Sequence, residues 1–513
     1  MTELVADDLE IGVISEELFP NIEMTPKTIE DVVELPTFLS KINLLEKRVG
    51  KRFEQLDLSV QQEVIFRRLQ QLYNILSLNP LWKQRFENHE IFETPQNFSD
   101  WQQLPISDKE VTLKFFSGKR LGMVVPLIKG GFEIVASGGT SSGTPSETVY
   151  SIKELKDSYV MTGHFMSRHV MKPHMSDETP KWAITTYADY QMWSSGTMIG
   201  GVLQEIPDAT FIGAGPVGKE VFQHMMAYEG DKLILGMTEG IAFLKDLSPG
   251  MSKRDKDSFK LAMFCSGLLS EKKARELKQV FPELSVLSYF SATQAEAIGI
   301  QLSEKDKCLT EVPGLHFIEI VDEEGKWVEV GEEGEILITR LHANEAPLIR
   351  YKLGDRMVRR PNLESQELQA QQFDFVGRTG DMLHVCDMQF SAPRVLNRLI
   401  EGLRLAGVCD LSMLAYEMQF RNIRQKKVLS LAVIVEDVFG LRSRLDYMLG
   451  EHGTHYHFVE ALISSMSIFG SGEANTHSIN KTDYRFEIKV MSKSETDELR
   501  TKLGKLPLVR DFV

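Results

Sequence analysis

A loop of glycines and small hydroxyl residues, ASGGTSSGTP at 136–145, is the segment of this chain best suited to hold an anion. Glycines let a phosphate approach the backbone, whose N–H groups can point at it, and the hydroxyls add donors. The loop lacks the G-x-x-x-x-G-K-[ST] pattern, so it is not a Walker loop. Taken alone, a plain surface loop is the simpler interpretation. The candidate anion contacts are Ser137, Gly138, Gly139, Thr140, Ser141, Ser142, Gly143 and Thr144.

A second glycine-rich segment, GAGPVG at 213–218, fits the G-x-G-x-x-G pattern between a strand and a helix. A dinucleotide site would also need to be the first strand–helix unit, with an acidic residue at the end of the next strand. Here an earlier strand at 181–187 precedes it, and the next strand at 232–237 ends without an acid. A tight turn is therefore favoured, and an NAD(P) enzyme is kept as an alternative.

Two polar residues later in the chain could hold a sugar. Asp355 ends the segment PLIRYKLGD and could accept hydrogen bonds from both hydroxyls of a ribose. Arg378, in VGRTGDML, has a planar fork that could bridge ribose and phosphate. Taken alone, Asp355 could equally be an aspartate of a hairpin turn, and Arg378 could equally be an ordinary surface arginine.

The composition excludes several classes of protein. A chain of 513 residues predicts two or three domains, and its formal charge of −15 argues against nucleic acid or an anionic membrane as partner. The four cysteines form no C-x-x-C pair, so we expect neither a disulfide framework nor a structural zinc site, and a cytoplasmic protein fits. The acidic N-terminus has no apolar region typical of a signal peptide, so we do not expect one. The sequence also contains no run of about 18 apolar residues, so we expect no membrane span.

The hydrophobic pattern predicts an α/β fold. Apolar residues recur at helical spacing from 28 to 93, and short apolar strands then alternate with helices, as in a mostly parallel sheet. Closer strands at 317–322, 327–330 and 334–340 predict an antiparallel or barrel-like subdomain, and 361–367 a polar loop. The predicted parallel strands are 181–187, 209–213, 232–237, 261–266 and 284–290.

The pattern changes to a small α+β unit after about 380. We expect helices at 393–405 and 441–449 and strands at 411–416 and 428–435. The predicted domains are an arm with a helical layer at 1–94, a sheet-containing domain at 95–379, and a mobile C-terminal lid at 380–513.

Five blocks together resemble the adenylate-forming enzymes, the superfamily of acyl-CoA synthetases, nonribosomal adenylation domains and luciferases. The chain is most similar to phenylacetate–CoA ligase and its relatives. In chain order the blocks are SGGTSSGTP, LAMFCSGLL, SYFSATQAEAIG, PLIRYKLGD and GRTGDML. The resemblance implies that ATP converts a carboxylic acid to acyl-AMP, which passes to CoA or to a carrier-protein thiol. An amine or alcohol acceptor and a binding protein on a decayed fold are alternatives, and a homodimer is compatible with it.

The resemblance also implies roles for single residues. The loop 137–144 would hold the β- and γ-phosphates, and Thr293 the α-phosphate. Ser266 and Gly267 would present backbone to adenine, Phe290 would stack on it, and Asp355 and Arg378 would hold the ribose. We expect the acyl pocket, suited to an aromatic or medium-sized apolar acid, to be lined by Tyr187, Trp193, Met198 and Gly215, although these side chains could equally be core.

The chain departs from the family at the metal-binding position. Gln294 stands where the family has the glutamate that binds Mg²⁺, and Glu296 lies two residues on. A neutral amide is a poorer ligand for a hard cation, so Glu296 is the predicted Mg²⁺ ligand. The resemblance also implies an interdomain hinge at Gly380 and an adenylation lysine at Lys505, with Lys502 as the alternative.

Overall fold

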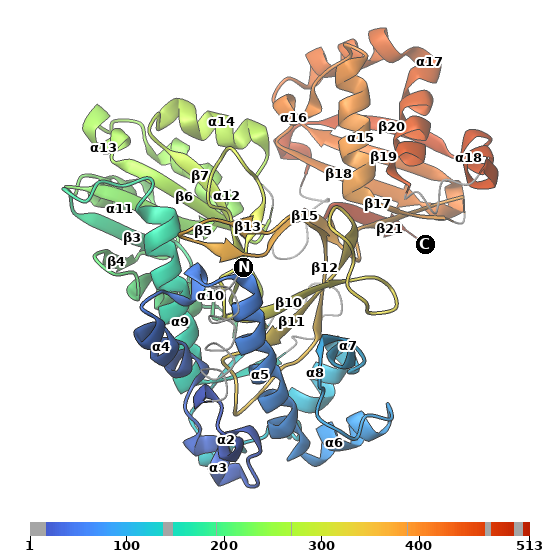
Figure 1. Cartoon of the computed structure of the whole chain (residues 1–513). Coiled ribbons are helices and arrows are strands. Elements are labelled where there is room, and N and C mark those ends of the chain that lie inside the picture. The colour runs from blue at the N-terminus through green and yellow to red at the C-terminus, as the bar shows by residue number, and fades with distance from the viewer. Residues whose placement is uncertain are drawn as a thin grey trace, which may run out of the picture. The chain divides into compact units, whose positions relative to one another are not determined.

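The computed structural model of the protein describes residues 17–136, 147–190, 192–267, 269–386, 388–466, 473–496 and 506–512 (Figure 1). The chain divides into two compact units. The first comprises Met1–Gly267, Val280–Leu353 and Met357–Phe375, and the second comprises Leu268–Gln279, Gly354–Arg356 and Val376–Val513. The predicted phosphate loop, Lys502 and Lys505 lie outside the described residues.

Helices form the N-terminal part of the first unit, as the spacing of apolar residues predicted. Thr28 caps the first longer helix with a capping box, and α5 buries Leu69, Leu72, Ile75 and Leu76 along one face. The helices are α2 (Asn21–Met24), α3 (Ile29–Glu34), α4 (Phe38–Val49), α5 (Leu58–Ser77), α6 (Pro80–Glu87), α7 (Phe98–Gln102) and α8 (Lys109–Phe116).

An eleven-stranded sheet dominates the first unit, in the order β10-β11-β12-β15-β9-β8-β7-β6-β5-β3-β4. Its parallel part is β3 (Lys181–Thr185), β4 (Thr210–Gly213), β5 (Asp231–Met237), β6 (Phe259–Cys265) and β7 (Ser285–Ser291). The connecting helices include α9 (Ile152–Met166), α10 (Ser195–Gln204), α11 (Lys219–Met226), α12 (Thr238–Phe243) and α13 (Lys253–Asp257); α14 (Glu271–Val280), between β6 and β7 in sequence, is grouped almost entirely with the second unit. The α/β prediction is confirmed, and each predicted parallel strand is present.

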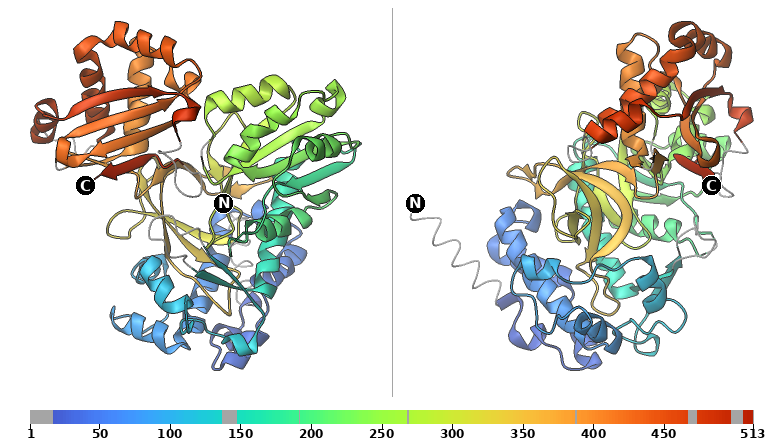
Figure 2. Two further views of the ribbon diagram at one scale, coloured as in Figure 1. Left: turned by 180° about the vertical axis from the view of Figure 1, so that it is seen from behind. Right: turned by 90° about the vertical axis from the view of Figure 1, so that its right-hand side faces the viewer.

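The strands become antiparallel between β7 and β8, in the yellow and orange region of Figure 2. These strands are β8 (Ala297–Ile300), β9 (Leu309–Thr310), β10 (His316–Val321), β11 (Glu333–Arg340), β12 (Tyr351–Arg359) and β15 (Gln372–Arg378). They continue the same hydrogen-bonded sheet. The predicted strand at 327–330 is wrong, because Trp327 makes only an isolated bridge to Val321. The predicted polar loop at 361–367 contains instead β13 (Leu363–Glu364), which pairs with β14 (Gln369–Ala370).

The second unit contains a four-stranded sheet in the order β20-β19-β18-β21 and a two-stranded one, β16-β17. Its main strands and helices are β16 (Met382–Val385), β17 (Met388–Ser391), α15 (Ala392–Leu405), α16 (Leu411–Leu414), β18 (Glu417–Ile423), β19 (Val428–Ile434), α17 (Val438–Ser465), α18 (Glu473–Asn480), β20 (Arg485–Met491) and β21 (Val509–Phe512).

Two predictions in the second unit need correction. The predicted strand at 411–416 is helix α16, because the Asp410 side chain accepts a hydrogen bond from the Ser412 amide and caps a helical turn. The predicted helix at 441–449 extends to Ser465, with a break at Gly450, where φ is +58°. Among the described residues, no helix is long and apolar enough to cross a lipid bilayer.

Candidate functional site

The predicted phosphate loop lies in sequence between two antiparallel strands, which the structure describes. Strand β1 (Phe132–Ala136) pairs antiparallel with β2 (Glu147–Ser151). At the end of β1, the Ala136 amide donates to the Met192 carbonyl at 2.8 Å. In β2, the Tyr150 hydroxyl donates to the Thr293 carbonyl at 2.7 Å. The two strands that flank the loop in sequence therefore bond to two other predicted site segments.

The turn after β7 carries the residues predicted to meet the α-phosphate and the metal. It is closed by a hydrogen bond from the Ala292 amide to the Glu296 carbonyl at 3.1 Å. Thr293 is half-buried, and the Gln294 side chain is buried. The turn therefore presents its residues from a fixed backbone.

The predicted adenine contacts lie at two parallel strands: Ser266 and Gly267 follow β6, and Phe290 lies near the end of β7. Ser266 is exposed and has φ of +72°, which is unusual for a residue with a side chain. Thr238 fixes this turn by donating to the carbonyls of Cys265 and Gly267. Phe290 is half-buried, and its ring packs 5.6 Å from that of Phe375, so one aromatic neighbour already contacts it.

Most of the predicted acyl-pocket residues lie near one another in the first unit. The ring of Tyr187 meets that of Trp193 edge-on at 6.0 Å, and its hydroxyl lies 3.3 Å from the Ser266 hydroxyl. A Cβ at Gly215, where φ is +65°, would lie 4.0 Å from the Ala188 methyl, so the 213–218 turn approaches the same segment. Met198 is buried in α10. The hydroxyl contact joins the predicted acyl pocket to the predicted adenine turn.

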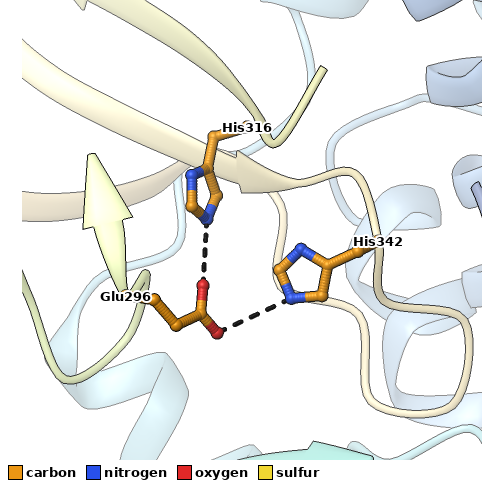
Figure 3. A group of neighbouring side chains, drawn as sticks. All are labelled: Glu296, His316 and His342. Carbon is orange, nitrogen blue, oxygen red and sulfur yellow. Dashed lines mark ion pairs between the residues drawn. The ribbon is translucent and has the colours of Figure 1, made fainter. Parts of the chain in front are cut away.

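Glu296 faces two imidazoles that the sequence analysis did not identify (Figure 3). One of its oxygens lies 3.3 Å from Nε2 of His316, and the other lies 3.6 Å from Nε2 of His342. All three side chains are buried. Burial pushes the pKa of Glu296 upward, but the imidazoles of His342 and His316 outweigh it and hold this pKa below its usual range.

The predicted ribose pair lies in the second unit, on the adjacent strands β12 and β15. Arg378 Nε lies 3.3 Å from an Asp355 oxygen, and the Arg378 side chain is 68% exposed. Burial raises the pKa of Asp355 to about 6, because Arg378 only partly offsets the loss of water. The Thr379 amide donates to the Gly354 carbonyl at 2.8 Å, which joins the two strands at this point.

Comparison with solved structures identifies the fold. A 2-hydroxyisobutyryl-CoA ligase in the postadenylation state with 2-HIB-AMP is similar, with a TM-score of 0.66, 13% identity, and coverage of 90% of this chain and 91% of the other. An open form of that ligase with 2-HIB-AMP and CoA gives a TM-score of 0.60 at 13% identity and covers 90% and 94%. The chain has the fold of the adenylate-forming ligases. These likenesses confirm the predicted fold.

Sequence similarity to curated proteins is confined to a short segment. No family model matches the chain. The D-alanine–D-alanyl carrier protein ligase of Bacillus licheniformis is 32% identical over 101 residues, which is 18% of this chain. The match covers 20% of that ligase, so this chain aligns with about a fifth of its length.

Within this ligase fold, three site residues escaped the sequence analysis: Tyr150, His316 and His342. None belongs to a recognised block, and histidines are usually read through short metal-ligand spacings. The signal lies in the strand register. His316 pairs with Arg340 across β10 and β11, so His342, two residues beyond that pair, lies near His316.

Proposed function

We propose that this protein uses ATP to convert a carboxylic acid to acyl-AMP and then transfers the acyl group to a thiol. The observation that carries the proposal is a pair of hydrogen bonds made by the strands on either side of the predicted phosphate loop. Ala136 at the end of β1 bonds to Met192, next to the predicted acyl pocket, and Tyr150 in β2 bonds to Thr293, the predicted α-phosphate contact. A nucleotide held by that loop would have its α-phosphate near both segments.

Two displacement steps make up the proposed reaction. A carboxylate oxygen attacks the α-phosphorus, and the bond from phosphorus to pyrophosphate breaks. A thiolate then attacks the acyl carbon, and the bond from that carbon to the AMP oxygen breaks. Neither step needs a protein nucleophile, so the protein's task is positioning and charge stabilisation. The assignments of Ser266, Gly267, Phe290, Asp355 and Arg378 to the nucleoside, and of Lys505 to adenylation, stay predictions.

The assignment of Mg²⁺ to Glu296 fits the structure poorly. Mg²⁺ prefers an octahedron of oxygen ligands that includes several waters. Glu296 is 5% exposed, and each of its oxygens faces an imidazole nitrogen. The other candidate, Gln294, is a neutral amide. The assignment remains a prediction, and no step of the proposed reaction depends on it.

The proposed substrate is an aromatic or medium-sized apolar acid, and the proposed acceptor is CoA or a carrier protein. The rings of Tyr187 and Trp193, with Met198 buried nearby in sequence, favour an apolar acyl group over a charged one. One structural neighbour is a CoA ligase, and the curated relative is a carrier-protein ligase. A closer relation to phenylacetate–CoA ligase and a cytoplasmic location belong to the same proposal.

A second candidate function is a binding protein on the same fold. Gln294 lacks the charge of the family's glutamate, and the Glu296 carboxylate is directed at His316 and His342. These two facts favour a binding protein over a ligase, because a ligase of this kind normally places a carboxylate beside the phosphates.

Exchange of labelled pyrophosphate into ATP, measured with a panel of acids, separates the two functions. Acid-dependent exchange is expected with aromatic or medium apolar acids and not with short charged ones. A Tyr187→Phe variant, which keeps the ring, should retain exchange, whereas Tyr187→Ala should lose it for the preferred acid only. ATP binding without exchange for any acid would instead support the binding protein.

A further inference from the structure

Glu296, His316 and His342 converge from three separate segments of the first unit. Glu296 immediately precedes β8, His316 begins β10, and His342 follows β11. Each offers one ligand atom, and the three atoms lie within 4.8 Å of one another. Figure 3 shows both oxygens of Glu296 directed at the imidazoles. The gap between the three side chains is therefore surrounded by electron-pair donors.

The distances in this cluster are long for hydrogen bonds and suited to metal ligands. Good N–H···O bonds span about 2.7–3.2 Å. The two pairs here are separated by 3.3 and 3.6 Å. Neighbouring ligands around a tetrahedral ion with bonds of about 2.1 Å lie about 3.4 Å apart. The two observed separations involve different oxygens of Glu296, so an ion would be held once one carboxylate oxygen turns toward both imidazoles.

The donor atoms are also unsatisfied within the described part of the protein. Both Glu296 oxygens, Nε2 of His316 and both ring nitrogens of His342 are buried without a hydrogen-bond partner there. Buried polar atoms are normally paired, so such a concentration needs an explanation. The backbone is strained at the same place, because φ of Glu296 is +25°.

We propose that Glu296, His316 and His342 bind a divalent transition-metal ion, with Zn²⁺ as the best-suited ion. Two imidazoles and one carboxylate form a known zinc ligand set, which leaves a fourth position for a water molecule. Hard cations such as Mg²⁺ prefer oxygen ligands alone, so they suit this set less well. Ligands must be an ionised carboxylate and neutral imidazoles.

The bound ion would stabilise the turn that carries the predicted α-phosphate contact. The hydrogen bond from the Ala292 amide to the Glu296 carbonyl encloses Thr293 and Gln294 in one turn. Fixing Glu296 against β10 and the end of β11 therefore fixes both residues. The three ligand side chains are at most 5% exposed, so the ion would act structurally, with a buried water in its fourth position. Metal binding itself is independent of the proposed ligase activity.

Metal content tests the site directly in the full-length protein. The protein is purified from Zn²⁺-supplemented cells, dialysed against metal-free buffer and analysed by elemental mass spectrometry. The variants are Glu296→Gln, His316→Gln and His342→Gln, with His89→Gln, an exposed histidine, as matched control. We expect about one Zn²⁺ per chain in the wild type and the control, and less than about a fifth of that in the others. Circular dichroism checks that each variant is folded.

A spectroscopic measurement on the wild type keeps the test decisive even where a variant fails to fold. The metal is removed with a chelator and Co²⁺ is added, since a tetrahedral nitrogen–oxygen site gives Co²⁺ strong visible absorption. Saturation at about one equivalent, unchanged by excess Mg²⁺, would support the site. Absence of both Zn²⁺ and the Co²⁺ spectrum from the wild type would overturn it and leave a metal-free charge cluster. Folded variants that keep full Zn²⁺ content would place the metal elsewhere and overturn it as well.

Discussion

Two buried carboxylates, Glu296 in the first unit and Asp355 in the second, have opposite electrostatic surroundings. Both are almost inaccessible, at 5% and 4% exposed. Glu296 faces two buried imidazoles, which hold its pKa below the usual range despite burial. Asp355 faces one arginine with a largely hydrated side chain, and burial raises its pKa to about 6. The burial of a carboxylate therefore does not determine its charge, which depends on how well its partner is shielded from water.

The difference indicates different tasks. Glu296 is enclosed with its partners, so its charge serves an internal interaction such as holding an ion. Asp355 has a largely exposed partner, Arg378, and a charge that is incompletely compensated. The charge of such a carboxylate is stabilised most by a ligand that donates hydrogen bonds to it, as the two hydroxyls of a ribose would.

The largest expected effect concerns stability. Replacing Glu296 with alanine leaves two buried imidazoles without their anionic partner, and breaking a buried pair costs about 3–5 kcal/mol. Replacing Asp355 with alanine should change the free energy of unfolding by less than about 1 kcal/mol, because its partner is solvated. Urea unfolding, followed by tryptophan fluorescence and circular dichroism, measures both. Similar losses in the two variants would contradict the distinction between the carboxylates.

The second prediction is that Asp355, which matters less than Glu296 for stability, matters more for ATP affinity. Asp355→Ala should weaken ATP binding by about 1–3 kcal/mol, because the ribose hydroxyls lose a charged acceptor. The matched control is Asp374→Ala, which removes a carboxylate that also pairs with an arginine but is 40% exposed. Titration calorimetry should show little change in the control. An ATP affinity that is unchanged in Asp355→Ala would remove the ribose assignment.

Most strands could be predicted because buried apolar runs bounded by turns admit few alternatives. The runs at 232–237 and 261–266 became β5 and β6. The segment at 411–416 failed because a short apolar run suits a helix or a strand equally, and the Asp410 cap decided the outcome. The strand predicted at 327–330 did not form, because strand pairing depends on a partner that local composition does not reveal. Trp327 makes only an isolated bridge.

The candidate site was accessible from sequence only where its residues lie in short blocks. Thr293, Gln294 and Glu296 share one block, so their proximity was evident. His316 and His342 were missed because the pairing of β10 with β11 brings them together, and that register follows from the whole sheet. The cysteine count argued against structural zinc, but it says nothing about sites built from histidine and glutamate.

The smallest expected effect is a pH dependence of nucleoside binding through Asp355. With a pKa of about 6 in the free protein, this carboxylate is almost fully ionised at pH 7.5 and roughly three quarters protonated at pH 5.5. A ligand that donates to the ionised form should therefore bind roughly fourfold more weakly at pH 5.5 than at pH 7.5. Adenosine is the appropriate ligand, because its lack of phosphate removes the titration of ATP from the measurement. Asp355→Asn should bind adenosine with an affinity that is flat over this range. If the wild type is equally flat, Asp355 is either already compensated or not in contact with the nucleoside, and its contrast with Glu296 loses its functional meaning.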